Sequence, residues 1–216
     1  MSQRPQGCRK HRPKPSLLPP QWTGAATLEL VWELNERALD VLADMAQMTS
    51  TSRSLDLVCL YQDLWADLDT PARKRAARCP FLLVDVHFQS DAWWNWATAP
   101  RSHIGKDTVS LSPLPANLAK ELMYETLVLA WHTARSDSCA ANALLAMSPK
   151  VAATLARLGL RDIHHIATHH SHYLRPQWEN LPLFWRHLLI AAHSDDNAAL
   201  HEVHLHGLQL LGTNLS

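Results

Sequence analysis

The sequence predicts an all-α protein composed of two consecutive small helical bundles. Only 6 of the 216 residues are glycine, whereas alanine and leucine, both good helix formers, are abundant. Several segments place apolar residues at i, i+3 and i+4, the spacing of one helix face. The hydrophobic share of 47% is typical of a globular protein with a sizeable core.

Four parts are predicted along the chain. Residues 1–24, rich in Pro, Arg and Lys, are expected to be a disordered basic arm, and residues 25–97 form an N-terminal helical domain. Residues 98–117 combine Pro, Ser and Gly with little periodicity and are the predicted linker. Residues 118–216 form a second helical domain.

In the N-terminal domain, apolar periodicity predicts helices over residues 28–48, 55–68, 71–79 and 91–97. Pro71 and Pro80 bound the third of these helices, and the fourth is rich in tryptophan. The segment FLLVDVHF, residues 81–88, suits either a short strand or a buried helical turn. Periodicity does not choose between the two at this length.

The C-terminal domain is predicted to contain helices over residues 118–134, 137–146, 181–192 and 197–211. The stretch between the second and third of these, residues 147–178, predicts two short helices joined by a tight turn. This arrangement is the shape of a helix-turn-helix DNA reader, and also of many plain helical hairpins.

Local signals define the predicted hairpin. Ser148 is the expected N-cap of its first helix, with Pro149 at the first helical position. Gly159 is expected to end that helix in a left-handed conformation, and Arg161 and Asp162 to open the second.

The two halves share an order of parts, which suggests a diverged tandem repeat. In each half a long amphipathic helix precedes a second helix, a short helix begun by proline, an aliphatic segment and a tryptophan-bearing helix. The comparison sets LWADLDTPARKRAARCPFLLVDVHF beside LLAMSPKVAATLARLGLRDIHHIA, with low identity.

Charge and cysteine content narrow the class of protein. The formal net charge is zero, so no strong overall field attracts nucleic acid, although five cations crowd the first fourteen residues. The 4 cysteines contain no CxxC pair, which favours a reducing cytoplasmic compartment. No run approaches the ~20 apolar residues of a membrane span, and no secretory signal is expected. The 9 tryptophans suit core packing or subunit contacts.

Catalytic and metal-binding patterns are weak. Of the 14 histidines, His165 and His169 stand at i, i+4, a spacing that can hold a metal on a helix, but no acidic third ligand accompanies them. No GxSxG, Gly-rich phosphate loop or paired acids are present. Cys79 is expected to be a buried small residue rather than a nucleophile. The sequence therefore predicts no enzyme activity, no cofactor and no metal site.

Basic residues favour nucleic acid more than any other ligand. Arg73, Lys74, Arg75 and Arg78 fall on one short predicted helix, and Arg157 and Arg161 flank the turn at Gly159. Such residues pair well with phosphates. The alternative is that they form only a solvated helix face.

Residues 122–170 resemble FlhD, one subunit of the bacterial flagellar master regulator. The resemblance rests on LVLA at residues 127–130, then Asp137, an alanine and a leucine before Met147, AATLARLGL at residues 152–160, and the following Ile163 and Ile166-Ala167. It implies a helical, oligomer-forming subunit of a transcriptional activator. That family binds promoter DNA with an FlhC-type partner and recruits RNA polymerase, and related pairs act on conjugative elements. The cysteine cluster of the FlhC partner is absent from this chain.

The sequence thus predicts a transcriptional regulator that acts on promoter DNA as a homo- or hetero-oligomer with an FlhC-like partner, away from membranes. The alternative is an adaptor that does not bind DNA and uses its helical hairpins as a docking scaffold. The predicted DNA-binding residues come from the hairpin and from the arm. They are Arg157, Arg161, His164, His165 and His169, with Arg9, Lys10 and Arg12 as phosphate contacts.

Overall fold

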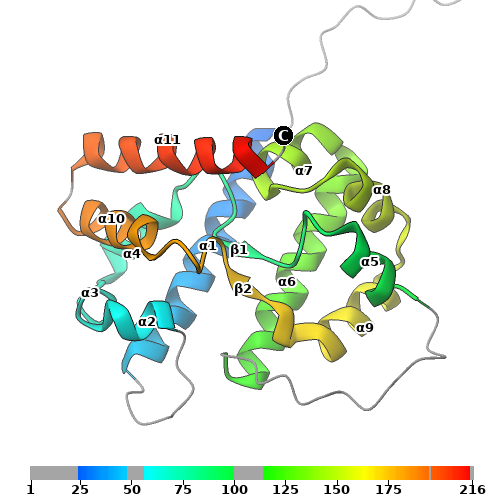
Figure 1. Ribbon diagram of the computed structural model, residues 1–216, viewed down its shortest axis with the longest axis horizontal. Coiled ribbons are helices and arrows are strands. Elements are labelled where there is room, and N and C mark those ends of the chain that lie inside the picture. The colour runs from blue at the N-terminus through cyan, green and yellow to red at the C-terminus, as the bar shows by residue number, and fades with distance from the viewer. Residues whose placement is uncertain (1–23, 48–55, 100–113, 195, 215–216) are drawn as a thin grey trace, which may run out of the picture.

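The computed structural model describes residues 24–47, 56–99, 114–194 and 196–214, and most of these residues are helical (Figure 1). The prediction of an all-α protein is confirmed. The first half contains α1 (Gly24–Gln47), α2 (Asp56–Leu60), α3 (Gln62–Ala66), α4 (Thr70–Ala77), β1 (Val84–Asp85) and α5 (Asp91–Ala97). The second contains α6 (Ala116–Ser136), α7 (Ser138–Leu145), α8 (Pro149–Arg157), α9 (Leu160–His170), η1 (Ser171–Tyr173), β2 (Arg175–Pro176), α10 (Pro182–His193) and α11 (Asn197–Asn214).

Two local features differ from the sequence prediction. The helix expected over residues 55–68 is interrupted at Tyr61, whose φ of −126° and ψ of 37° lie outside the helical region. Gly159 does not end α8 in a left-handed conformation, because its φ is −91° and it is the N-cap of α9. Its backbone N–H donates to Asp162 Oδ2 at 2.9 Å. The left-handed helix end in this region is Ala146, with a φ of 54°, after α7.

A short strand pair joins the two halves of the chain. Within residues 81–88, Val84–Asp85 forms β1, which pairs antiparallel with β2 from the second half. Val84 lies opposite Pro176, and Asp85 lies opposite Arg175. The pair lies near the centre of the view in Figure 1. Periodicity cannot predict strands of two residues, since both are too short to show any alternation.

The buried apolar side chains of both halves form one continuous cluster. The long helices α1 and α6 pack against each other, α10 packs on α3 and α4, and α5 packs on α8. The division into two domains at residues 98–117 stays a prediction, since most of that segment lies outside the described residues.

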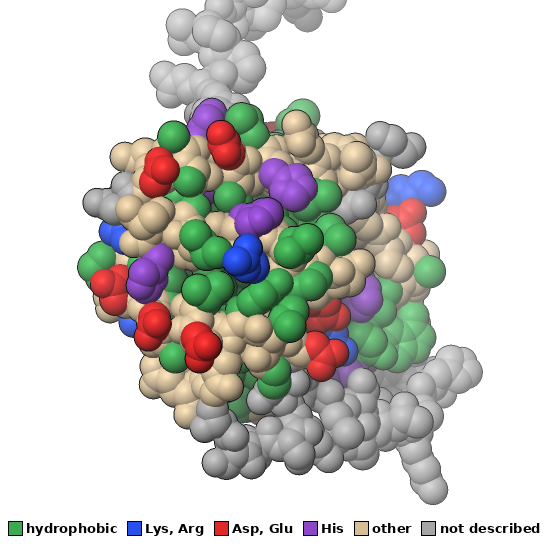
Figure 2. All heavy atoms as spheres, turned by 60° about the vertical axis from the view of Figure 1, so that its left-hand side comes forward, with side chains coloured by type: hydrophobic (Ala, Val, Ile, Leu, Met, Phe, Trp, Pro, Cys, Tyr) green, Lys and Arg blue, Asp and Glu red, His purple; other side chains and the backbone are tan. Residues whose placement is uncertain are grey.

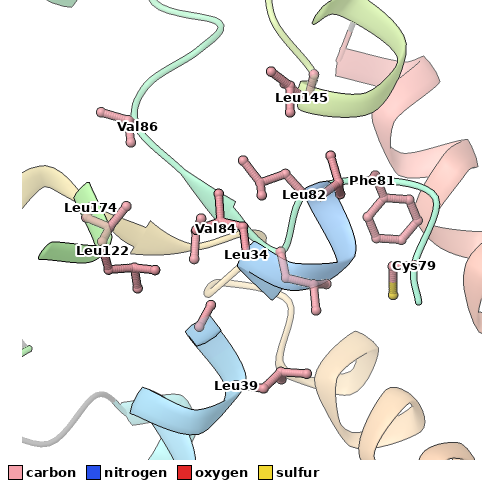
Figure 3. Close-up of a cluster of buried hydrophobic side chains, with 14 of the residues drawn as sticks. Leu34, Leu39, Cys79, Phe81, Leu82, Val84, Val86, Leu122, Leu145 and Leu174 are labelled. Carbon is pink, nitrogen blue, oxygen red and sulfur yellow. The ribbon is translucent and has the colours of Figure 1, made fainter. Parts of the chain in front are cut away.

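The segment that precedes and includes β1 runs through the middle of this cluster. Phe81, Leu83 and Val86 are fully buried. Figure 3 shows side chains of this segment surrounded by residues from both halves, among them Leu34, Leu39, Leu122, Leu145 and Leu174. Because much of the segment is neither helix nor strand, its backbone N–H and C=O groups need partners from elsewhere.

Asn35 of α1 supplies several of those partners. Its side chain is fully buried, and its Nδ2 donates to Ala77 O at 3.1 Å and to Phe81 O at 2.9 Å. Its Oδ1 accepts from the backbone N–H of Leu83 at 2.8 Å. One amide therefore uses both donors and its acceptor to hold the segment against α1.

Gly207 brings α11 close to the same segment. A Cβ atom at this position would overlap the ring of Phe81, whereas a Cβ at Gly212, five residues further along α11, would meet nothing within 4 Å. The absence of a side chain at residue 207 thus allows the helix to lie directly on the core.

Replacing Asn35 with alanine should lower the free energy of unfolding by at least about 3 kcal/mol, because two buried carbonyls and one N–H lose their partner. Thr126→Val is the matched control. Thr126 is also fully buried, but its hydroxyl donates only to Leu122 O within α6, so the expected loss is below about 1 kcal/mol. Urea unfolding measures the free energy of unfolding of the two variants. Equal losses for Asn35→Ala and Thr126→Val would contradict the role given to Asn35.

Gly207→Ala and Gly212→Ala should have opposite effects on stability. Both replace glycine in α11 with a better helix former, a gain of up to about 1 kcal/mol. At residue 207 the overlap with Phe81 should outweigh this gain and cost about 1–3 kcal/mol in total. Thermal unfolding should show a lower melting temperature for Gly207→Ala and an unchanged or higher one for Gly212→Ala.

Candidate nucleic-acid interface

The candidate interface is built on α8 and α9, whose local structure follows the sequence closely. Ser148 caps α8, since its Oγ accepts from the Val151 N–H at 3.2 Å, and Pro149 takes the first helical position. Helical spacing places Val151, Leu155 and Leu158 on one face, of which Val151 and Leu155 are buried and Leu158 is half-buried. Trp131 of α6 donates its indole N–H to Leu158 O at 2.8 Å and so fixes the α8–α9 connection against the core.

One face of α9 is buried and the other carries the predicted DNA-binding residues. Ile163, Ile166 and Ala167 face the core and are at most 2% exposed. The predicted residues within the described part of the chain lie on the opposite side of α9 or at the end of α8, and we call this surface the α8–α9 face. Arg157, Arg161, His164 and His169 are exposed on it, and His165 is half-buried. The arm residues Arg9, Lys10 and Arg12 lie outside the described residues.

The two arginines of the α8–α9 face contrast with those basic residues of the described structure that a carboxylate holds. Arg73 pairs with Asp40 at 3.3 Å, and Arg37 pairs with Glu121 at 3.3 Å. No hydrogen bond or ion pair holds the guanidinium of Arg157 or Arg161 within the described residues. Asp162, the acidic residue of α9, is engaged by the Gly159 N–H. The α8–α9 face therefore presents two arginines able to accept an anionic partner.

Part of the basic cluster on α4 has a structural role instead. Arg73 is half-buried in its pair with Asp40, and Arg75 Nε donates to Ala192 O of α10 at 2.8 Å. Lys74 and Arg78 remain exposed. Of the four basic residues on this helix, these two are therefore the ones accessible to a ligand.

Aromatic rings and imidazoles continue the α8–α9 face toward α5. The rings of His165 and His169 stack with centroids 4.2 Å apart, and His169 Nδ1 lies 3.0 Å from His165 O. Trp96 of α5 is 50% exposed and its ring lies 4.8 Å from that of His170. Tyr173 packs edge-on against Trp93 at 5.4 Å. Exposed planar rings beside arginines provide surfaces on which nucleobases stack.

A pocket lies where the end of α5 meets α9. Its volume is about 270 Å³, and Arg161 and His165 line it together with Thr98, Leu158 and Ile166. Sequence reasoning did not include the α5 side of this site. The available signal was the three closely spaced tryptophans of residues 91–97, of which Trp96 is 50% exposed.

The remaining candidate chemistry is structural. Among the described residues, no group of three or more His, Cys, Asp or Glu side chains is placed to hold a metal ion. Cys79 is fully buried, as expected, and its thiol donates to Ala76 O at 3.1 Å. Burial raises the pKa of this thiol far above its ordinary value, so it stays protonated.

Two apolar surfaces lie outside the α8–α9 face, and the second borders it through Tyr124, whose ring lies 6.0 Å from that of His164. On α10 and α11, Leu183, Ile190, Leu205 and Leu208 are 40–62% exposed, and Figure 2 shows hydrophobic side chains gathered on this side of the molecule. Between α1 and α6 lies a groove of about 480 Å³. Its lining is mainly apolar, with charged residues at the rim, and consists of Leu30, Glu33, Leu34, Arg37, Tyr124, Glu125, Val128, Leu129 and His132.

No helix among the described residues is by itself long and apolar enough to cross a bilayer. Only α7 and α8 taken together meet that test of length and composition, and they are bent by 119° relative to each other.

Comparison with known proteins adds no relative to this picture. No family model, no curated protein and no solved structure matches the chain.

The stability of the protein should depend on the protonation of His204 in α11. Burial lowers the pKa of this imidazole, and the nearby His201 lowers it further. Its buried Nε2 has no hydrogen-bond partner among the described residues. The unfolded chain therefore binds a proton at this imidazole more readily than the folded protein does. The stability that neutral His204 contributes is fully present above the unfolded pKa of 6.5. It is lost as the pH falls through that value toward the folded pKa.

His204→Gln should therefore lose less stability than the wild type when urea unfolding is repeated from pH 8 to pH 5. His193→Gln, which changes an exposed histidine at the end of α10, is the control and should follow the wild type. Parallel pH profiles for all three proteins would contradict the assignment.

Proposed function

We propose that this protein is a transcriptional regulator that contacts DNA through the α8–α9 face. The observation that carries the proposal is the exposure of Arg157 and Arg161 on one surface, with no acidic partner for either side chain within the described residues. A guanidinium presents a planar fork of N–H donors that matches the oxygens of a phosphate group.

The surroundings of the two arginines support a nucleic-acid ligand over a small anion. The stacked imidazoles of His165 and His169 extend the surface along α9, and Trp96 supplies an exposed ring. Arg161 and His165 line the pocket beside α5, so a phosphate group bound there would contact both side chains. The sequence resemblance to FlhD spans residues 122–170 and so covers α8, α9 and most of α6.

The proposed regulator acts in the cytoplasm as part of an oligomer with an FlhC-like partner, and the complex recruits RNA polymerase. The zero net charge supports the need for a partner, because the whole chain generates no strong attraction for DNA. In this proposal the arginines of the α8–α9 face, helped by Arg9, Lys10 and Arg12 of the arm, contribute a local part of the affinity.

The second candidate function is that of an adaptor that binds protein rather than DNA. The apolar side chains on α10 and α11 favour it, because Leu183 is 62% exposed and Leu205 46%. Clustered exposed leucines are typical of protein-binding surfaces. The two functions predict different dependence on salt, since phosphate contacts weaken as salt rises and apolar contacts do not.

Fluorescence anisotropy with a labelled 30-base-pair duplex tests the proposal. For Arg157→Ala/Arg161→Ala, the slope of log K against log salt concentration should fall by about two, one for each lost phosphate contact. Arg186→Ala, which removes an exposed cation from α10, should leave the slope unchanged. Absence of binding at low salt, or an equal effect of both variants, would favour the adaptor.

A further inference from the structure

The pairing of β1 with β2 is unchanged by a shift of 91 residues along the chain. Val84 and Asp85 shifted by 91 residues become Arg175 and Pro176, which are the whole of β2. When each residue is replaced by its counterpart in the other half, Val84 becomes Arg175 and Pro176 becomes Asp85. The pair Val84–Pro176 thus becomes the pair Arg175–Asp85, which is the other pair of the same ladder. Any antiparallel pair of equally long strands has such a local two-fold axis, so the evidence for a repeat is that other elements share the same shift of 91 residues.

The same shift relates the residues that follow each strand. His87 has a φ of 51° and Trp178, 91 residues later, has a φ of 52°. Large side chains seldom adopt this left-handed conformation, so two instances at matching positions are informative. The next helices also correspond, since α5 begins at Asp91 and α10 at Pro182.

The helices before the strands obey the same relation. Shifted by 91 residues, α1 falls on α6, the pair α2 and α3 falls on α8, and α4 falls within α9. Several matched positions hold the same buried residue in both halves. These are Ala43 and Ala134, Ala76 and Ala167, Leu83 and Leu174, and Trp94 and Trp185.

Several contacts between helices repeat in the two halves, although that of α4 with α10 has no comparable equivalent between α9 and α5 in the described structure. The helix α1 packs on α4 as α6 packs on α9, and α10 packs on α3 as α5 packs on α8. The helices α1 and α6, which correspond to each other, pack together. This geometry matches α4 with α9, whereas the sequence comparison set residues 71–79 beside α8.

We infer that the two halves are diverged copies of one unit related by an internal two-fold axis, and that α4 carries a second phosphate-binding surface equivalent to the α8–α9 face. This inference rests on the proposed function. The ligand it names is a nucleic-acid duplex, whose backbone offers two phosphate stretches related by a two-fold axis, as dimeric DNA-binding proteins require.

The side chains of α4 suit this role. Lys74 and Arg78 occupy the positions that His165 and His169 occupy in α9, and both are exposed. The cations of α4 that are held by the protein are Arg73, paired with Asp40, and Arg75, bonded to Ala192 O. The counterparts of Arg157 and Arg161 are Ala66 and Thr70, so the surface of α4 offers its cations only at the positions of the two histidines.

Salt-dependent anisotropy of the full-length chain on the same duplex tests the inference. Lys74→Ala/Arg78→Ala should lower the slope of log K against log salt by about two, as Arg157→Ala/Arg161→Ala does, and the quadruple variant should lower it by about four. The control, Lys120→Ala/Arg186→Ala, removes two exposed cations from α6 and α10 and should keep the wild-type slope. The conservative variant Lys74→Arg/Arg78→Lys should retain the wild-type slope, which separates charge from folding.

The outcomes distinguish this inference from the proposed function. If the α4 variant keeps the wild-type slope while the Arg157/Arg161 variant lowers it, the proposed function stands and the second surface is ruled out. If neither variant changes the slope, or the wild type does not bind the duplex, both proposals fall. If the control lowers the slope as much as the α4 variant does, the duplex binds exposed cations wherever they lie on the protein, and the inference is overturned.

Discussion

The buried amide of Asn35 is the interaction on which the rest of the structure depends. The chain between α4 and α5 passes through the core with little regular structure, so its backbone groups must find partners that helices normally supply. Asn35 satisfies Ala77 O, Phe81 O and the Leu83 N–H at once. Because Asn35 holds the segment, Val84 and Asp85 lie where they pair with β2. The side chains of the segment then pack in a core that both halves share.

Much of the fold could be predicted from the sequence because its helices are amphipathic or carry clear boundary signals. The periodicity of residues 28–48 and 118–134 located α1 and α6, and Ser148 with Pro149 located the start of α8. The pairing of β1 with β2 could not be predicted, since two-residue strands have no periodicity and their contact spans the two halves. Gly159 was misassigned because an N-cap and a left-handed C-cap are both favourable sites for glycine.

The candidate site was predictable in composition but not in shape. The sequence predicts the exposed residues of this face, Arg157 at the end of α8 and Arg161 with the histidines of α9. It does not separate the cations of α4 that hold the fold, Arg73 and Arg75, from those that face solvent, because their partners Asp40 and Ala192 lie far away in the sequence. The contribution of Trp96 was likewise hidden, since tryptophan is a usual core residue and only packing decides which ring remains exposed.

These observations support a protein in which one core presents cationic helices on its surface, with the apolar surface of α10 and α11 left for a protein partner. Hydrogen–deuterium exchange of the full-length chain, with and without a DNA duplex, tests this account most directly. The account predicts slower exchange on DNA binding in α8, α9 and α4, with α10 and α11 unchanged. Protection confined to α10 and α11, or no protection anywhere, would contradict it.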